Sequence, residues 1–457
     1  TTLPAVMYQW TNSPQEGVTM PQHGAKSREF FERAQRVIPY GVNSNFRYSG
    51  DDDTLVVADA RDGYVYDFDG KRYIDYRLGY GPVILGHTDP FVNGRVKEAI
   101  DHGLSFAATQ RYEVKVAERI VDMCPGVEMV RLSNTGSECT MHAIRLARGH
   151  TGRDIVLKFE GCYHGAHDYV LWSTASGNID KVGERHHPRA YKQSIGIPEV
   201  MRDLIQLCPW NDVEVLGEIL QERGEEIAAI IVEPMLGNGA GLMPQPGYLE
   251  FLRQQCDQYG IVLIFDEVKT GFRMAPGGAG EYFGVLPDIS TFAKAMGNGY
   301  PIAAFGGKKE VMMSIRPGKV FQGGTYTGNV VSTAAADATL EYIQSGKAFE
   351  QLNKVGGILM AGIGEILNRY SVPHFINGVP AMFGITFTDT QPRDWRDLFK
   401  ADWDLYEAIT NHMIEKGVMP EPDGFEPYFL CVDHTQEDAA ETLQAFEDGL
   451  KLALGKN

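Results

Sequence analysis

A lysine and an aspartate each follow a short predicted strand. Residues 261–265 run into Asp266, and residues 288–293 run into Lys294, which precedes a glycine-rich turn. In an open α/β sheet, ligands bind beyond the carboxyl ends of the strands, so both side chains are expected beside a ligand. A partly desolvated lysine amine can form a Schiff base with a carbonyl group. Taken singly, Asp266 could instead cap a helix, and Lys294 could reach solvent as most lysines do.

Small hydrogen-bonding residues precede a predicted helix at residues 136–148. Thr135, Gly136 and Ser137 stand at its start, where free backbone N–H groups converge and can hold an anion. Such residues also serve as ordinary N-caps, which is the commoner explanation.

A tyrosine and a histidine, Tyr163 and His164, follow a predicted strand at residues 155–159. Tyr163 could stack on a flat ring or belong to the core. Together, the four features supply an anion cradle, a stacking aromatic, a carboxylate and an amine nucleophile, all at predicted strand ends. Pyridoxal phosphate (PLP) needs a phosphate anchor, ring stacking, a partner for its ring nitrogen and a Schiff-base lysine. The sequence therefore predicts a PLP site.

These side chains need a sheet to bring them together, and the middle of the chain predicts one. From about residue 95, short strands that are apolar throughout alternate with helices, which indicates an α/β fold with a mostly parallel sheet covered by helices. A chain of 457 residues is long enough for two or three domains. We expect an N-terminal arm and part of a small domain at 1–80, a large domain at 81–343, and the rest of a small α+β domain at 344–457.

The individual elements follow from apolar periodicity and turn residues. Asp69-Gly70 between two alternating stretches predicts a hairpin, and the residues up to Pro21 are expected to be irregular. Strands are predicted at 55–59, 64–68, 72–75, 127–132, 155–159, 227–233, 261–265, 288–293, 382–388 and 428–432, and helices at 27–37, 136–148, 213–223, 247–259, 348–370 and from 436 onward.

The charge and the cysteines narrow the kind of protein. A net charge of −18 argues against nucleic acid and anionic membranes as partners. The six cysteines are scattered without a CxxC pair, so buried thiols in a reducing compartment are expected, and no metal site is predicted. The first twenty residues do not read as a leader, and no apolar run has membrane-spanning length. We therefore expect a cytoplasmic enzyme.

Longer strings of residues resemble one known family. The chain is similar to the class III aminotransferases of PLP fold type I, and above all to the glutamate-1-semialdehyde 2,1-aminomutase-like group. The resemblance runs from about Ser27 to the C-terminus. It is carried by the strings at residues 40–47, 81–87, 134–138, 158–165, 266–273, 323–329 and 425–427.

The resemblance implies a role for each cofactor residue. Lys294 would form the Schiff base and move protons, and Asp266 would keep the ring nitrogen protonated. Val268 and Tyr163 would enclose the ring. The remaining implied cofactor-binding residues are Thr135, Gly136 and Ser137 at the phosphate, Thr325 reaching it from a neighbouring subunit of a homodimer, and His164, Asn238 and an orienting Glu233.

The resemblance also implies residues on the substrate side. Arg47 matches an arginine that grips a substrate carboxylate, with Ser44 beside it, because a guanidinium meets a carboxylate with two hydrogen bonds. Arg47 could instead form a surface salt bridge. Glu426 matches a residue that can pair with that arginine in the empty site, and Tyr80 would form part of the pocket wall.

Three functions stay open at this level. We expect first an aminotransferase that passes an amino group from an amine or amino acid to a keto acid, pyruvate or 2-oxoglutarate. The segment 173–198 and the residues after Lys294 depart from the mutase pattern and favour this choice. The alternatives are glutamate-1-semialdehyde 2,1-aminomutase, an isomerase, and a non-catalytic PLP-binding protein, against which Lys294 and Asp266 argue. Lys269 could lie near the ring or point to solvent.

Overall fold

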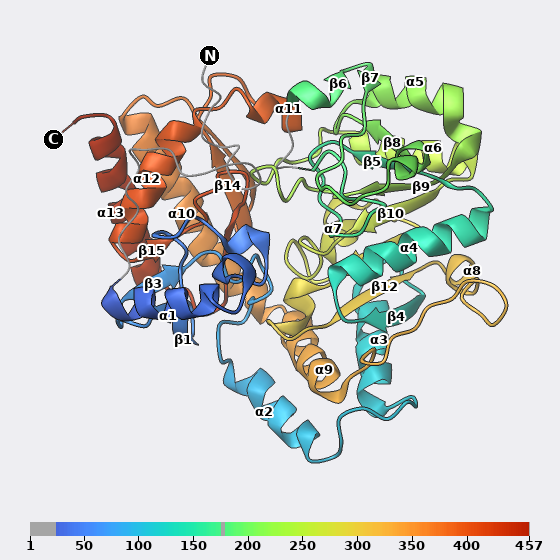
Figure 1. Cartoon of the computed structure of the whole chain (residues 1–457), viewed down its shortest axis with the longest axis horizontal. Coiled ribbons are helices and arrows are strands. Elements are labelled where there is room, and N and C mark those ends of the chain that lie inside the picture. Colours follow the sequence, from blue (N-terminus) through green and yellow to red (C-terminus); the bar gives the residue numbers. More distant parts are fainter. Residues whose placement is uncertain (1–23, 175–178, 457) are drawn as a thin grey trace.

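The computed structural model describes residues 24–174 and 179–456, so the arm predicted up to Pro21 lies outside the described residues. Figure 1 shows two lobes side by side. One lobe contains a large sheet with helices on both of its faces. The other brings segments from near both ends of the chain together.

The large lobe is built on a seven-stranded sheet of order β4-β12-β11-β10-β9-β5-β8. Only β12 runs antiparallel to its neighbours among these strands, so the predicted mostly parallel sheet is confirmed. The strands are β4 (Met129–Ser133), β5 (Ile155–Phe159), β8 (Ile205–Cys208), β9 (Ile227–Val232), β10 (Val262–Asp266), β11 (Ile289–Phe292) and β12 (Ala303–Gly307).

The central strands are apolar throughout because both faces of the sheet are buried. Ile231 and Ile264 pack on one face with Ala143 of α4 (Gly136–Thr151). Ile230 and Leu263 pack on the other face. Successive side chains of a strand point to opposite faces, so covering both faces requires an unbroken apolar run rather than an alternating one.

The second lobe joins the two ends of the described chain. Strands β1 (Val57–Arg61), β2 (Tyr64–Asp67) and β3 (Arg72–Asp75) form a sheet with β15 (Val418–Met419), which runs parallel to β3. The hairpin predicted at Asp69-Gly70 lies between β2 and β3. A further sheet of this lobe contains β13 (Phe375–Val379), β14 (Met382–Thr386) and β16 (Tyr428–Phe429). The short strands β6 (Gly183–Glu184) and β7 (His187–Pro188) pair with each other on the large lobe, beside α5 (Val213–Arg223) (Figure 1).

The other helices surround these sheets (Figure 1). The α-helices are α1 (Ala25–Gln35), α2 (Pro90–Ile100), α3 (Arg111–Met123), α5 (Val213–Arg223), α6 (Tyr248–Tyr259), α7 (Gly278–Phe283), α8 (Lys309–Met312), α9 (Val330–Gln344), α10 (Lys347–Arg369), α11 (Trp395–Leu398), α12 (Trp403–Glu415) and α13 (Gln436–Ala453). The 3-10 helices are η2 (Pro39–Gly41), η3 (Asn45–Arg47), η4 (Ile179–Lys181), η5 (Glu199–Leu204), η6 (Gly224–Glu226) and η7 (Lys294–Gly297).

A fully buried arginine ties the lobes together. Arg273 follows β10 in the large lobe and donates hydrogen bonds to the carbonyl oxygens of Ala381 at 2.9 Å, Leu430 at 2.8 Å and Gly81 at 2.7 Å. Burial lowers its pKa to about 10. Because a buried guanidinium needs hydrogen-bond acceptors, the Ala381 and Leu430 carbonyl groups hold the small lobe against the large one.

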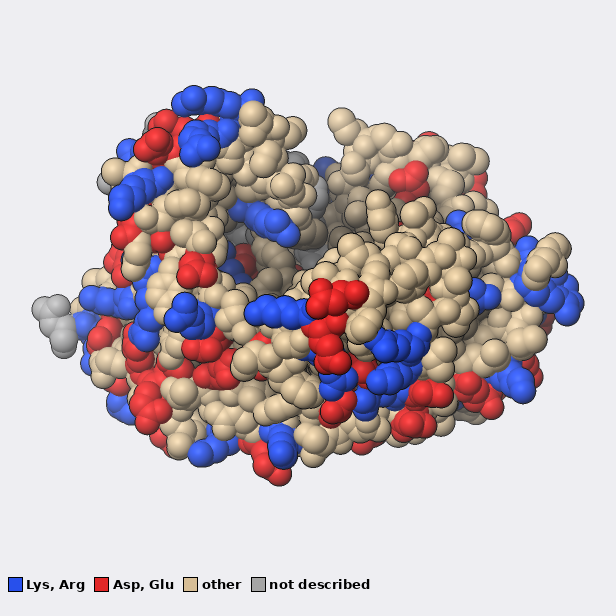
Figure 2. All heavy atoms as spheres, turned by 90° about the horizontal axis from the view of Figure 1, so that it is seen from below, with Lys and Arg blue, Asp and Glu red and all other residues tan. Residues whose placement is uncertain are grey.

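The surface between the lobes is hollowed. Figure 2 shows this hollow in the view from below, with basic and acidic side chains interspersed on the same face. Among the described residues, no helix is both long enough and apolar enough to cross a membrane.

Candidate active site

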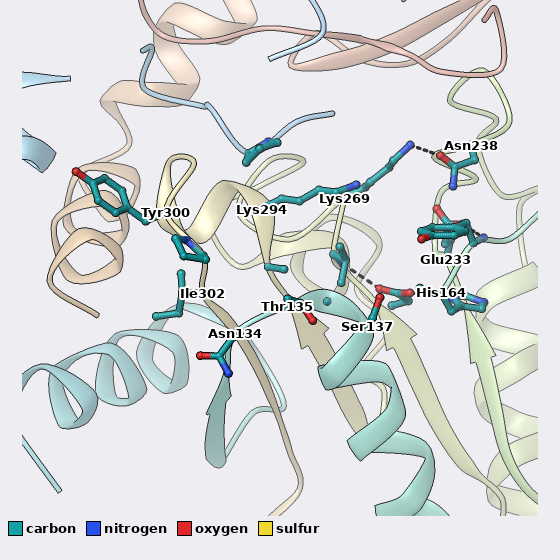
Figure 3. Close-up of a pocket in the computed structure, with 18 residues that line it drawn as sticks. Asn134, Thr135, Ser137, His164, Glu233, Asn238, Lys269, Lys294, Tyr300 and Ile302 are labelled. Atoms are coloured by element: carbon teal, nitrogen blue, oxygen red, sulfur yellow. Dashed lines mark hydrogen bonds and ion pairs between the residues drawn. The ribbon is translucent and has the colours of Figure 1, made fainter. Parts of the chain in front are cut away.

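A cavity of about 330 Å³ lies where β10 and β11 end and α4 begins (Figure 3). All of the predicted cofactor residues except Thr325 line it. These are Thr135, Gly136, Ser137, Tyr163, His164, Glu233, Asn238, Asp266, Val268 and Lys294. The parallel strands bring them together because their carboxyl ends meet at one edge of the sheet.

Lys294 stands immediately after β11, at the start of η7 (Lys294–Gly297). Its backbone is in the left-handed region, with φ of +45°, which is costly for a residue that has a Cβ. Burial lowers the pKa of its amine to about 7, and the nearby positive charge of Lys269 acts in the same direction. A substantial share of the amine is therefore neutral near pH 7 and able to act as a nucleophile.

Asp266 ends β10 and is buried, with hydrogen bonds to both carboxylate oxygens. Its Oδ1 accepts from the backbone N–H of Val268 and from the Thr291 hydroxyl, each at 3.1 Å. Its Oδ2 lies 2.7 Å from Nδ1 of His164. These contacts fix the carboxylate in one orientation on the cavity wall, as a partner for a protonated ring nitrogen must be.

His164 supports Asp266 from behind. Burial lowers the pKa of its imidazole, which favours the neutral ring. A neutral ring that meets a carboxylate through Nδ1 carries its hydrogen there and donates it, a tautomer assigned from the hydrogen-bond network. Within the part of the chain that the structure describes, Nε2 of His164 has no hydrogen-bond partner.

The anion cradle is the N-terminus of α4. Thr135 is its N-cap, and its hydroxyl accepts from the backbone N–H of Glu138 at 3.2 Å. The Ser137 hydroxyl accepts from the backbone N–H of Ala166 at 3.2 Å. Free N–H groups at a helix start favour a phosphate, so the cradle fits the phosphate of PLP.

Two glycines keep this cradle open. A Cβ at Gly136 would lie 3.0 Å from a methyl carbon of Val268. Gly165 has φ of +105°, and a Cβ there would lie 2.5 Å from Oγ and 2.8 Å from Cα of Ser137. The backbone can approach this closely only because both side chains are absent.

Glu233 connects two loops of the site. Its carboxylate accepts from the backbone N–H of Tyr163 at 2.8 Å and from that of Gly237 at 3.0 Å. Burial raises its pKa to about 7, against the opposing effect of Lys269. Tyr163 in turn packs edge-on against Phe46, with ring centroids 5.5 Å apart. Glu233 thus holds the loop that carries Tyr163 at the cavity.

Lys269, whose place the sequence left open, lies inside the site. It lines the cavity and is 7% exposed. Its ammonium donates to the Gly237 carbonyl at 3.2 Å, to Oδ1 of Asn238, and to Oε2 of Glu426 at 2.6 Å. Figure 3 shows the side chain extended toward Asn238. Lys269 therefore does not point to solvent.

The predicted substrate residues do not line the cavity. Arg47 is exposed on η3, and among residues 24–174 and 179–456 its guanidinium has no ion-pair partner. Glu426 pairs with Lys269 and not with Arg47. The Tyr80 hydroxyl donates to the Phe46 carbonyl at 2.5 Å. The predicted substrate-binding roles of Ser44, Arg47, Tyr80 and Glu426 stay predictions.

Thr325 is exposed in the single chain and lies outside the cavity. The cavity also has walls that were not predicted as site residues. Pro82, Asn134 and Gly165 lie within family strings and Ala293 stands beside Lys294, so adjacency could have found these four. No such signal marked Tyr300, Pro301 and Ile302.

A mostly parallel sheet that presents a lysine, a carboxylate and a helix N-terminus to one cavity defines a PLP enzyme. The chain belongs to the class-III aminotransferase family, which it matches over residues 48–450. Its cofactor is pyridoxal phosphate, and the fold is PLP fold type I.

Three relatives place the chain within that family. It is 41% identical to a glutamate-1-semialdehyde 2,1-aminomutase of Methanopyrus kandleri, over 94% of this chain and 98% of the relative. It is 38% identical to the same enzyme of Methanosarcina acetivorans, over 93% and 98%. Among solved structures, an omega-transaminase from Sphaerobacter thermophilus is 29% identical, with a TM-score of 0.87 over 94% of this chain and 98% of that one.

The first functional prediction, amino transfer to a keto acid, is wrong. The two aminomutases match nearly the whole chain at 41% and 38% identity and favour the alternative, an isomerase. The motifs could not decide between these reactions, because both use the same lysine, ring partner and phosphate cradle. The departures at residues 173–198 and after Lys294 do not outweigh this identity over nearly the whole chain.

Proposed function

We propose that this protein is an aminomutase that moves the amino group of glutamate 1-semialdehyde from carbon 2 to carbon 1. The observation that carries the proposal is the 41% identity to the Methanopyrus kandleri enzyme of that name over 94% of the chain. The aldehyde oxygen and the amino group exchange places, giving a 1-amino ketone of the same composition. The reaction is internally balanced, so no external amino acceptor is consumed.

The cofactor supplies an electron-withdrawing ring that stabilises negative charge on the carbon bonded to nitrogen. Asp266 would face the ring nitrogen and hold its proton, with His164 and Thr291 keeping the carboxylate in place. Thr135, Gly136 and Ser137 would hold the phosphate at the start of α4, and Tyr163 and Val268 would enclose the ring.

Lys294 would hold the cofactor and move the proton. Its amine, with a pKa lowered by burial to about 7, can deliver a proton to substrate carbon 1 and accept one from carbon 2. The same amine serves both steps because it stands at one fixed point on the cavity wall, at the end of β11.

The proposal is tested by following substrate carbon 1 by NMR. Holoenzyme is incubated with glutamate 1-semialdehyde, and we expect the aldehyde carbon to become an aminomethyl carbon through Lys294-dependent turnover. The Lys294→Ala variant is the control for uncatalysed rearrangement. An aldehyde carbon that persists at the control rate would contradict the proposal.

A homodimer is part of the same proposal. Thr325 lies on an exposed segment together with Phe321 and Tyr326, which are 76% and 67% exposed in the single chain. Large exposed apolar side chains support an interface with a second copy, through which Thr325 would reach the neighbouring phosphate. A sedimentation mass of one chain would contradict the dimer. Location in the cytoplasm stays a prediction.

A further inference from the structure

The cavity contains a second ammonium beside that of Lys294. Lys269 reaches it from the loop after β10, and its stem passes over Gly237, where a Cβ would lie 2.6 Å from Cδ of Lys269. Only a glycine leaves room for this path. Among the described residues, Lys269 and Lys294 are the cavity-lining side chains that carry an amine.

The three partners of the Lys269 ammonium differ in kind. The Gly237 carbonyl and the Asn238 amide oxygen are neutral and belong to the large lobe. The third partner, the Glu426 carboxylate, comes from the segment between β15 and β16 in the small lobe. The Lys269 side chain is 6% exposed and that of Glu426 is 14% exposed. Asn238 is 7% exposed, so among the described residues the charged hydrogen-bond partner of this cation is more exposed than the amide partner.

We propose that Lys269 binds the carboxylate of the substrate, which takes the place of the Glu426 carboxylate. This rests on the proposed function, whose substrate carries a carboxylate at the end away from the reacting carbons. Exchanging one carboxylate for another leaves the ammonium neutralised and its two neutral hydrogen bonds intact. A ligand with a neutral end cannot make this exchange, because it would leave a buried cation without its ion-pair partner.

The exchange makes the site specific for ligands with a negatively charged end. Glu426 competes with such a ligand, so removing the Glu426 charge should raise the affinity for carboxylate ligands. Removing the Lys269 charge should lower that affinity. If the ion pair only holds the two lobes together, removing either charge should lower the affinity for carboxylate ligands. The opposite signs therefore separate a binding residue from a structural latch.

The test measures the affinity of the holoenzyme for pentanoate and for pentanamide, which has the same length and no charge, by titration calorimetry. In Lys269→Met we expect pentanoate binding to weaken about tenfold or more, since a charge-assisted contact is lost. In Glu426→Gln we expect pentanoate to bind severalfold more tightly. Pentanamide should change little in either variant, and Lys354→Met, at an exposed lysine of α10, is the matched surface control.

Pentanoate affinity that is unchanged in Lys269→Met, or that falls in both variants, overturns the inference. Should Lys269→Met not fold, Glu426→Gln alone decides, because tighter pentanoate binding supports the exchange and weaker binding refutes it. The readout needs no turnover. A wild-type enzyme that binds pentanoate through Lys269 but leaves glutamate 1-semialdehyde unchanged would refute the proposed function and not this inference.

Discussion

The two sides of the active site relate differently to the sequence. On the cofactor side, the lysine, the aspartate and the anion cradle all lie at strand ends of one sheet, and the structure brings them to one cavity. On the substrate side, Arg47 is exposed and Glu426 pairs with Lys269 from the other lobe. A single sheet edge makes the first side predictable from local motifs. The second side depends on contacts between segments 157 residues apart.

The largest loss of turnover is expected for Lys294→Ala, which removes the side chain at the centre of the cofactor side. Proton transfer by a positioned group is alone worth ~10²–10⁴-fold, so we expect turnover to fall about a thousandfold or more. Steady-state kinetics on glutamate 1-semialdehyde measures this loss. Residual activity within tenfold of wild type would show that Lys294 is not the reacting amine.

Asp266→Asn keeps the shape of the side chain and removes its charge. We expect turnover to fall about 100-fold, because the ring nitrogen loses the carboxylate that holds its proton. His164 keeps a hydrogen-bonding partner in this variant, so folding should be preserved, which circular dichroism checks. An unchanged rate would mean that Asp266 supports the loop rather than the ring.

Gly165→Ala should weaken cofactor binding about tenfold, because the new Cβ meets Ser137 in the cradle. Gly152→Ala is the matched control, since Gly152 also has positive φ, +73°, but nothing among the described residues lies within 4 Å of its Cβ position. Both variants should lower the melting temperature, and only Gly165→Ala should raise the dissociation constant for PLP. Equal PLP affinities would refute the packing argument.

The smallest expected effect concerns pH. The capture of PLP by the cofactor-free protein needs the neutral Lys294 amine, so its rate should rise with pH around the amine pKa of about 7. Removing the Lys269 cation in Lys269→Met removes a cause that lowers this pKa, so the midpoint should move to higher pH. Lys269→Arg keeps the charge and should keep the midpoint. A shift to lower pH in Lys269→Met would contradict the electrostatic account.

Much of the fold could be predicted where sequence signals are strong. Residues Ile155–Phe159, Arg72–Asp75 and Val213–Arg223 form the predicted elements with the predicted bounds. Two strands of the large sheet, β8 and β12, were not predicted. Strand β12 reads Ala-Ala-Phe-Gly-Gly, and alanine and glycine have low strand propensity, so only its neighbours β4 and β11 make it a strand.

The site divides in the same way. Thr135, Asp266 and Lys294 could be predicted because each stands at the end of an element that the sequence itself defines. The position of Lys269 could not be predicted, because it depends on the absent side chain of Gly237 and on Glu426 across the lobes. The reaction could not be predicted either, since motifs around the cofactor do not encode where the amino group goes.

The central claim, an internally balanced aminomutase reaction, is tested most directly by counting product per active site with no keto acid present. Holoenzyme carrying the amine form of the cofactor is given glutamate 1-semialdehyde, with and without added pyruvate or 2-oxoglutarate. We predict many turnovers at a steady rate that the keto acids do not increase. A reaction that stops after about one amino group per site, and resumes only when a keto acid is added, would contradict the claim.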